Sequence, residues 1–273
     1  MGMDKVVVRA KDKDTNVVDK LKYAVIQTNV WNATKIDGFI EVSSEMDKMD
    51  THVKVNDIEL KQRTIFAYPE IAIGNNLMND PFNKSLTEIV SFPIKLETAI
   101  KYEIKLRSHF SINLFKPSNL PFNISYDFWI RKNINSHEHP EENDAEIMIW
   151  LYRNEQKPIG TYSGDIKVDC LVNGKEQNIK FSQWVGRGNR WLTISYIIDP
   201  VDQNEENDIE ISLSKFLAAY LNKIDEKKEI YYLLGIELGS EFGNPDEKRM
   251  ELSWTLGLYK MKFNGSSFDL LKN

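Results

Sequence analysis

The segment 144–151 alternates along the chain in the way a β-strand does. An extended backbone places Ile147, Ile149 and Leu151 on one face, which is typical of a protein core. The opposite face carries a carboxylate, a thioether and aromatic rings: Glu146, Met148, Trp150 and Tyr152. Such a row suits the floor of a groove for a ligand with apolar faces and hydroxyl groups. The alternative is a solvated glutamate beside packed methionine and tryptophan.

Similar short apolar runs, separated by turn residues, recur along most of the chain. Asn173-Gly174 is a favoured two-residue hairpin turn. Strands or extended runs are expected at residues 6–8, 23–30, 39–42, 64–68, 92–96, 102–106, 109–114, 122–130, 165–171, 176–184, 190–198, 229–237 and 250–263. This spacing predicts an antiparallel sandwich rather than alternating strands and helices.

One helix is expected after Ser212, which can cap its start. Its apolar residues recur with helical spacing and form a single stripe: Leu213, Phe216, Leu217, Tyr220, Leu221 and Ile224. The stripe favours packing on the sandwich over a cofactor site.

A second segment, 235–243, brings a further carboxylate. Glu237, Gly239 and Glu241 share a strand face, and glycine inside a strand indicates a close approach to the backbone. Two such strands side by side would place Glu146 and Glu241 across one groove. Glycoside hydrolysis uses such a pair, with retention of configuration at a spacing of roughly 5 Å and inversion at about 6.5–9.5 Å.

Six short motifs in order resemble glycoside hydrolase family 12, the endo-β-1,4-glucanase and xyloglucanase family, and in particular its hyperthermophile branch. The first is Glu-x-Met-Ile-Trp at Glu146 to Trp150. The others are Asn29-Val30-Trp31, Tyr68 to Ile71 with Gly74, Tyr126-Asp127, Pro158-Ile159-Gly160 and Gly239 to Phe242. In the last motif Phe242 follows the glutamate directly, which departs from the family pattern.

The resemblance implies an all-β fold: a β-jelly roll of two antiparallel sheets with a concave substrate cleft and one outer α-helix. It implies Glu146 as nucleophile, Glu241 as acid/base and Asp127 as a supporting residue that hydrogen-bonds the nucleophile. Expected substrate-binding residues are Asn29, Trp31, Trp129, Met148, Trp150, Pro158, Trp184 and Phe242. Trp191 and Trp254 are assigned to packing. No metal or cofactor is needed.

The activity expected on this basis is endo-acting, retaining hydrolysis of cellulose-type or mixed-linkage β-1,4-glucans. A xyloglucan-specific enzyme is an alternative. A non-catalytic carbohydrate-binding sandwich would keep the aromatic residues without needing both carboxylates. The presence of both glutamates favours the enzyme.

Composition narrows the partners. The net charge of −6 and a pI near 5.4 exclude a basic nucleic-acid footprint. We expect a neutral β-glucan as the binding partner. We also expect that the chain has no membrane span and is a monomer. Residues 1–20 are expected to be a flexible segment before a single catalytic domain over 21–273.

Other features concern location and metals. Cys170 is the only cysteine, so no intrachain disulfide can form. A polymer-degrading enzyme must act outside the cell, so we expect a secreted protein whose signal peptide has been removed, although an intracellular protein would have the same start. His137-Glu138-His139 could hold a metal, but a solvated loop is the favoured interpretation.

Overall fold

Most of the chain is β-strand, as the alternation predicts. The computed structural model describes residues 5–74, 92–132, 134, 140–188, 190–222 and 231–272. The strands are β1 Val6–Asp12, β2 Val18–Lys20, β3 Val25–Gln27, β4 Ala33–Glu45, β5 Lys48–Leu60, β6 Glu70–Gly74, β7 Ile94–Lys95, β8 Lys105–Lys116, β9 Phe122–Arg131, β10 Ala145–Asn154, β11 Thr161–Val172, β12 Lys175–Gly188, β13 Trp191–Ile198, β14 Glu206–Ser212, β15 Tyr232–Leu233, β16 Gly235–Gly239, β17 Met250–Phe263 and β18 Ser266–Asp269.

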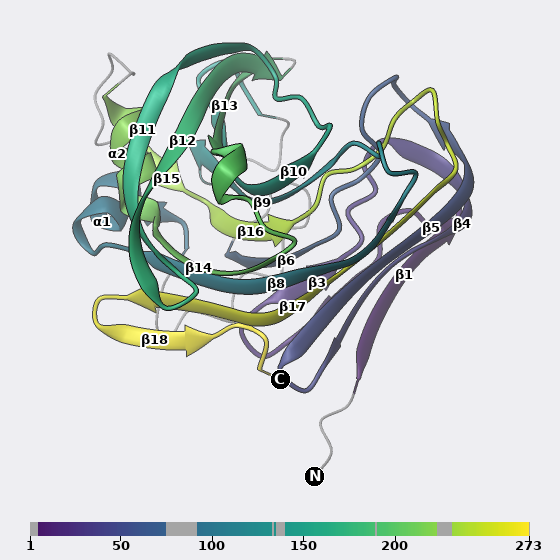
Figure 1. The fold of residues 1–273 in the computed structure, drawn as a ribbon, viewed down its shortest axis with the longest axis horizontal. Helices are drawn as coiled ribbons and strands as arrows, with labels where there is room; N and C mark the ends of the chain where they lie inside the picture. The colour runs from purple at the N-terminus through teal and green to yellow at the C-terminus, as the bar shows by residue number, and fades with distance from the viewer. Residues whose placement is uncertain are drawn as a thin grey trace.

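These strands form the two layers of a jelly roll. The outer layer runs β1-β4-β5-β17-β8-β14, and the inner layer runs β2-β3-β6-β16-β9-β10-β13-β12. Strand β11 pairs with both β12 and β14, so hydrogen bonding passes continuously from one layer to the other. Figure 1 shows β11 and β12 curving over between the layers.

Two details of the two-sheet jelly roll were not predicted. The layers are joined through β11, and the pair β10–β13 is parallel. At the start of the chain, the strand expected at residues 6–8 is confirmed as part of β1. The segment expected to be flexible over 1–20 contains β1, which pairs with β4 from Val6 opposite Ser44 to Asp12 opposite Ile36, and it also contains β2. Hydrogen bonding to β4 holds the apolar residues of β1 in an extended strand.

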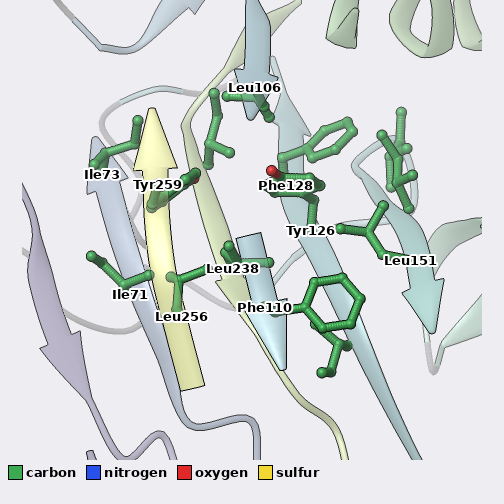
Figure 2. Packing of buried hydrophobic residues seen from close by; sticks show 14 of the residues in the cluster. Ile71, Ile73, Leu106, Phe110, Tyr126, Phe128, Leu151, Leu238, Leu256 and Tyr259 are labelled. Atoms are coloured by element: carbon green, nitrogen blue, oxygen red, sulfur yellow. The ribbon is translucent and has the colours of Figure 1, made fainter. Parts of the chain in front are cut away.

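The core lies between the layers. Side chains from β6, β9, β10 and β16 meet side chains from β8 and β17, as Figure 2 shows. Tyr126 of β9 and Tyr259 of β17 approach with ring centroids 6.1 Å apart. Ile147, Ile149 and Leu151 belong to this core, which confirms the apolar face predicted for the strand.

Tyr152 does not lie on the face predicted for it. The ladder between β10 and β9 shifts register after Trp150, so that Tyr152 pairs with Ile124 of the core face. Its ring stacks on Phe122 with centroids 5.6 Å apart. A β-bulge adds one residue to one strand and thereby reverses the faces beyond it.

The predicted helix is α2, Leu213–Leu221, and its apolar stripe is buried. Phe216 meets Phe181 and Tyr196 edge-on, each with ring centroids 5.1 Å apart. Ser212 precedes the helix but makes no side-chain capping bond, and Ile224 lies outside the described residues. A second, short helix was not predicted: α1, Leu96–Lys101, follows β7 where only an extended run was expected. A 3₁₀ turn, η2, spans Pro200–Asp202.

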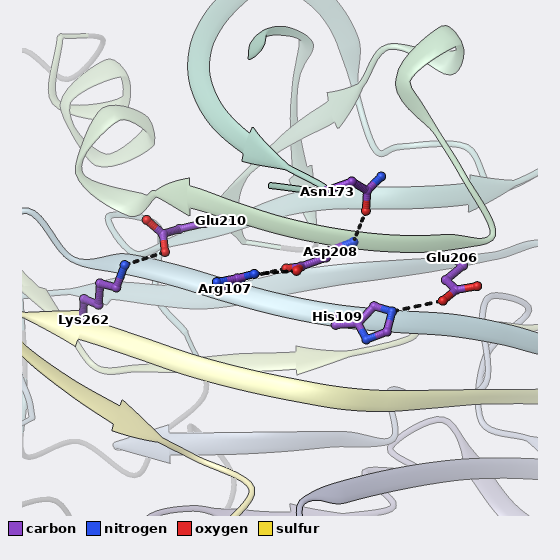
Figure 3. A network of polar contacts seen from close by, with 7 residues as sticks. All are labelled: Arg107, His109, Asn173, Glu206, Asp208, Glu210 and Lys262. Carbon is purple, nitrogen blue, oxygen red and sulfur yellow. Dashed lines mark hydrogen bonds and ion pairs between the residues drawn. The ribbon is translucent and has the colours of Figure 1, made fainter. Parts of the chain in front are cut away.

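A network of charged side chains covers the solvent side of β8, β14 and β17 (Figure 3). Arg107 binds Asp208 through two hydrogen bonds of 2.8 and 2.6 Å, and the pKa of Asp208 is lowered as a result. The backbone N–H of Asp208 also donates to Asn173, at the predicted Asn173-Gly174 turn, where both residues have positive φ. The network thus links the β11–β12 hairpin to the outer layer.

Within the described part of the chain, no helix is long and apolar enough to cross a membrane.

Two glycines at β-bulges allow a matched test of packing at the ladder. Gly38 and Gly164 have the same φ of +121°, but a Cβ on Gly38 would lie 2.1 Å from the carbonyl oxygen of Lys54, whereas one on Gly164 would meet nothing within 4 Å. Gly164→Ala should cost about 1 kcal/mol of unfolding free energy through its backbone conformation alone. Gly38→Ala should cost about 1–3 kcal/mol more because of the steric overlap. Urea denaturation of both variants measures the difference, and equal losses would contradict the register of β4 on β5.

Candidate active site

Strand β9 is the centre of the candidate site, because it is buried on both faces. Alternate residues Ile124, Tyr126 and Phe128 face the core, and the other face is polar although it is also buried. That second face carries Asn123, Ser125, Asp127 and Trp129. Burial of a polar strand face is costly unless its groups are bonded, so this face is a candidate for function.

The ladders on either side of β9 bring the predicted carboxylates to this face. On β10, Glu146 lies opposite Trp129 and Met148 lies opposite Asp127. On β16, Glu237 lies opposite Asp127. Paired residues point to the same side of a sheet. Asp127 therefore has β10 side chains on one flank and Glu237 on the other.

Glu146 is held by two donors from β13. Its Oε2 accepts hydrogen bonds of 3.0 Å from the indole Nε1 of Trp191 and of 3.0 Å from the hydroxyl of Thr193. Thr193 is the register partner of Glu146 in the parallel pair. Burial raises the pKa of Glu146, and both hydrogen bonds oppose this by stabilising the carboxylate.

Trp191 was assigned to packing, and this assignment is wrong. Besides its bond to Glu146, its ring meets Trp129 edge-on, with centroids 5.3 Å apart. The signal in the sequence was the alternation of Trp191, Thr193 and Ser195 against the core residues Ile194 and Tyr196. Trp254, by contrast, is fully buried in the core as expected.

Glu241 is fixed to β9 by Asn123. The side-chain amide of Asn123 donates to Glu241 Oε2 at 2.7 Å, and the backbone N–H of Glu241 donates to Asn123 Oδ1 at 3.0 Å. A third bond joins the N–H of Asn123 to the carbonyl of Glu241 at 3.0 Å. Burial first, and then the charge of Glu146, raise the pKa of Glu241 to about 8, against the lowering effect of the Asn123 amide.

Asp127 lies between the two glutamates along β9 and is 7% exposed. Burial raises its pKa well above the usual range, and the charges of Glu146, Glu237 and Glu241 add to this. The resemblance implied that Asp127 hydrogen-bonds Glu146, but the bonds that the structure gives Glu146 come from Trp191 and Thr193. Among the residues that the structure describes, Asp127 Oδ1 has no hydrogen-bond partner.

Two further carboxyl groups were not assigned to the site from the sequence. Glu70 of β6 is fully buried, and its Oε1 accepts from the amides of Gln27 and Asn29, the latter at 2.8 Å. Its neighbour Glu237 is 5% exposed and lies diagonally across the β6–β16 ladder on the same face. Asn29, expected to bind substrate, thus holds a carboxylate of the site. The sequence signal was Glu237 on the same strand face as Glu241.

Most of the predicted aromatic residues lie on this side of the inner layer. Met148, Trp150 and Ile197 form a cluster separate from the main core, with Trp184 packed against it. Trp184 is half-buried, and Tyr162, which is 54% exposed, meets it edge-on with centroids 6.0 Å apart. Trp31 and Pro158 are partly exposed, and their role in binding stays a prediction.

Phe242 does not belong to this surface. It is fully buried in the main core, where it meets Phe66 edge-on with centroids 6.4 Å apart. The backbone N–H of Phe66 donates to the carbonyl of Phe242 at 2.9 Å, which fixes it there. The expectation that Phe242 contacts substrate is therefore wrong, because alternation beyond Glu241 turns its ring inward.

A buried ion pair positions the start of β10. Arg131, at the end of β9, donates to Asp144 at 2.8 Å, and the two side chains are 1% and 5% exposed. Asp144 immediately precedes β10, so the pair fixes where the strand with Glu146 begins. Among the residues that the structure describes, no group of three or more His, Cys, Asp or Glu is arranged to hold a metal ion, and His137 and His139 lie outside them.

Replacing the indole donor should change the ionisation of Glu146. Trp191→Phe keeps a ring against Trp129 but removes the N–H that stabilises the carboxylate. The pKa of Glu146 should rise by about one pH unit. NMR of glutamate carboxyl carbons, with Glu146→Gln identifying the signal, measures it. Trp184→Phe is the control, since that indole bonds Ser182 instead, and an equal shift in both variants would refute the assignment.

The stability of the fold should fall as pH rises. Folded Glu241 keeps its proton up to about pH 8, whereas in the unfolded chain the group loses it near its ordinary pKa of 4.5. Between these two pH values the folded state binds one more proton than the unfolded state. The contribution of Glu241 to the free energy of unfolding therefore falls by about 1.4 kcal/mol for each unit of increase in pH. Urea denaturation between about pH 5 and about pH 8 should show this fall, which Glu241→Gln should reduce.

The control for this experiment is Glu251→Gln. The pKa of Glu251 is lowered by its bond to Lys54, so Glu251 is ionised in both states over the same range and its removal leaves the pH dependence unchanged. A wild-type stability that rises over this range would contradict the burial of neutral carboxyl groups.

Comparison with solved structures gives close matches to the whole fold. A family 12 xyloglucanase from Bacillus licheniformis has 19% sequence identity and a TM-score of 0.68, covering 94% of this chain and 99% of that one. An endoglucanase Cel12A from Rhodothermus marinus has 16% identity and a TM-score of 0.64, covering 98% and 100%. Endoglucanase 3 of Trichoderma harzianum has 16% identity and a TM-score of 0.60, covering 92% and 96%.

These likenesses concern the fold, and no curated protein sequence matches the chain. The sequence itself matches the family model described as glycosyl hydrolase family 12 over residues 22–259. That match covers most of the chain, and the site just described lies within it. The chain therefore belongs to glycosyl hydrolase family 12 and is a glycoside hydrolase.

Proposed function

We propose that this chain is an endo-acting β-1,4-glucanase that hydrolyses with retention of configuration. The observation that carries the proposal is that Glu146 and Glu241 reach the same buried face from opposite sides of β9. They lie close enough for the charge of Glu146 to raise the pKa of Glu241. A scissile bond lying over β9 would have one carboxyl group on each side of it.

The two environments favour different protonation states. Glu146 accepts two hydrogen bonds, which support a carboxylate that can attack the anomeric carbon. Glu241, with its pKa raised to about 8, keeps a proton near neutrality and can give it to the glycosidic oxygen. In this reaction the bond to the leaving sugar breaks as Glu146 forms a glycosyl ester. Water, deprotonated by Glu241, then cleaves the ester.

The same observations weigh against a non-catalytic binding module. Aromatic residues alone can bind sugars, but Glu70, Asp127, Glu146, Glu237 and Glu241 all have raised pKa values from burial. Burying ionisable groups opposes stability, and enzymes accept this cost at sites that need tuned acids. Binding alone does not require it.

The substrate that we propose is a cellulose-type or mixed-linkage β-glucan. Because such a polymer is degraded outside the cell, we propose that the enzyme is extracellular. A neutral polymer suits an acidic protein, and the half-buried Trp184, which packs against the buried Trp150, offers a ring for stacking. The structural neighbours include a xyloglucanase as well as endoglucanases, so a xyloglucan specialist is the second candidate. Parallel reducing-sugar assays on carboxymethylcellulose, barley β-glucan and xyloglucan discriminate between the two.

The roles of the glutamates can be tested together. Glu146→Gln should abolish hydrolysis of every substrate. Glu241→Gln should abolish polysaccharide cleavage but retain part of the first step with an aryl cellobioside, whose leaving group needs little protonation. Azide should then rescue the Glu241 variant and give a β-glycosyl azide, whereas with Glu146→Ala it should attack directly and give the α-azide.

The control is Glu206→Gln, on the solvent side of the outer layer, which should keep wild-type rates. An α-azide from the Glu241 variant would reverse the two roles. In the wild type, proton NMR of the first product from a cello-oligosaccharide should show the β-anomer. Early α-anomer would exclude double displacement.

A further inference from the structure

The site contains a second carboxyl pair that the hydrolytic mechanism does not use. Glu70 of β6 lies opposite Gly239 and Glu237 of β16 lies opposite Ala72, so the two side chains are diagonal neighbours on one face of the ladder, within hydrogen-bonding reach of each other. Glu70 is 0% exposed and Glu237 is 5% exposed. Two carboxylates repel, so a bond between them requires that one of the two carries a proton.

The amides around the pair indicate which group is neutral. Glu70 Oε1 accepts from the side-chain amides of Gln27 and Asn29. Two N–H donors stabilise a negative charge on Glu70. Glu237 has no corresponding amide donors in the described structure, and its bond to Glu70 raises its own pKa, as expected for the group that donates. The proton therefore belongs to Glu237.

The proton on Glu237 matters because Glu237 lies beside the other carboxyl groups of the site. Glu237 is the register partner of Asp127, and the charge of Glu146 also raises its pKa. The titratable groups around the pair are Asp127, Glu146 and Glu241 on the site face, Tyr68 beside β6, and Tyr259 across the core.

We propose that Glu237 is a positioning residue for the catalytic carboxylates: it donates its proton to Glu70 and so presents a neutral group, rather than another carboxylate, to Asp127 and Glu146. A charged Glu237 would oppose ionisation of Glu146, which must be a carboxylate to attack. The inference rests on the proposed function for the roles of Glu146 and Glu241, but the protonation of the pair can be measured independently.

Glutamine substitutions separate the two members of the pair. Glu237→Gln keeps a donor to Glu70 and no charge, so it is the conservative variant. Glu70→Gln reverses the pair, because its Oε1 can still accept from Gln27 and Asn29 while its new amide donates to Glu237. Glu237 then becomes the acceptor and ionises beside Asp127.

The first measurement is NMR of glutamate carboxyl carbons, which needs no substrate. The signal that Glu237→Gln removes should report a protonated carboxyl at about pH 7 in the wild type and a carboxylate in Glu70→Gln. An ionised Glu237 in the wild type would overturn the proposal. This wild-type result decides even if Glu70→Gln fails to fold, which circular dichroism would reveal.

The second measurement is the pH dependence of kcat/KM on barley β-glucan. Its acidic limb reports ionisation of Glu146 in the free enzyme. Glu70→Gln should move this limb up by about one pH unit, and Glu237→Gln should leave it in place. The double variant, with no carboxylate in the pair, should return the limb to the wild-type position. A merely structural role would not produce that rescue.

The outcomes distinguish the two proposals. If the wild type hydrolyses no glucan while Glu237 is protonated, the proposed function is refuted, but the assignment of the proton to Glu237 stands. If Glu70→Gln hydrolyses glucan with the wild-type pH dependence, the positioning role of Glu237 is refuted and the proposed function stands. The same conclusion follows if the acidic limb shifts in Glu237→Gln.

Discussion

Five carboxyl groups buried on one face of a sheet cannot all be charged, and this constraint governs the site. Glu70, Asp127, Glu146, Glu237 and Glu241 all have pKa values raised by burial. The interaction between like charges is strong where water is excluded. The placing of N–H donors therefore decides which of these groups lose their protons more readily: Glu146 beside Trp191 and Thr193, and Glu70 beside Gln27 and Asn29.

The sequence could predict features that depend on local periodicity. The alternation in 144–151 identified both the core face and Glu146, and the spacing of the apolar residues after Ser212 identified α2. The layered all-β fold followed from the same patterns. The candidate catalytic carboxylates could be found because Glu146 and Glu241 each sit in a strand-like segment whose other residues are unusual for a solvent-facing surface.

Features that depend on pairing between distant strands could not be predicted in this way. Glu70 and Glu237 become neighbours only through the ladder of β6 on β16, and Trp191 reaches Glu146 only through the parallel pair. A bulge, which no alternation reveals, turned Tyr152 toward the core. Phe242 looked accessible because it follows Glu241, yet its ring lies inward against Phe66. Register is a property of the whole sheet, so these errors cluster where a strand ends or shifts.

The parallel pairing of β10 with β13 affects how the protein folds. Parallel neighbours need a long connection, and here the β11–β12 hairpin lies between them. Trp191, which donates to Glu146, is 45 residues away along the chain. Contacts of such high sequence separation form late, because the entropy of closing the loop must be overcome first. The strand that carries Glu146 can therefore acquire the donors that hold its carboxylate only after the hairpin has formed, which makes the ionisation of Glu146 a property of the finished fold.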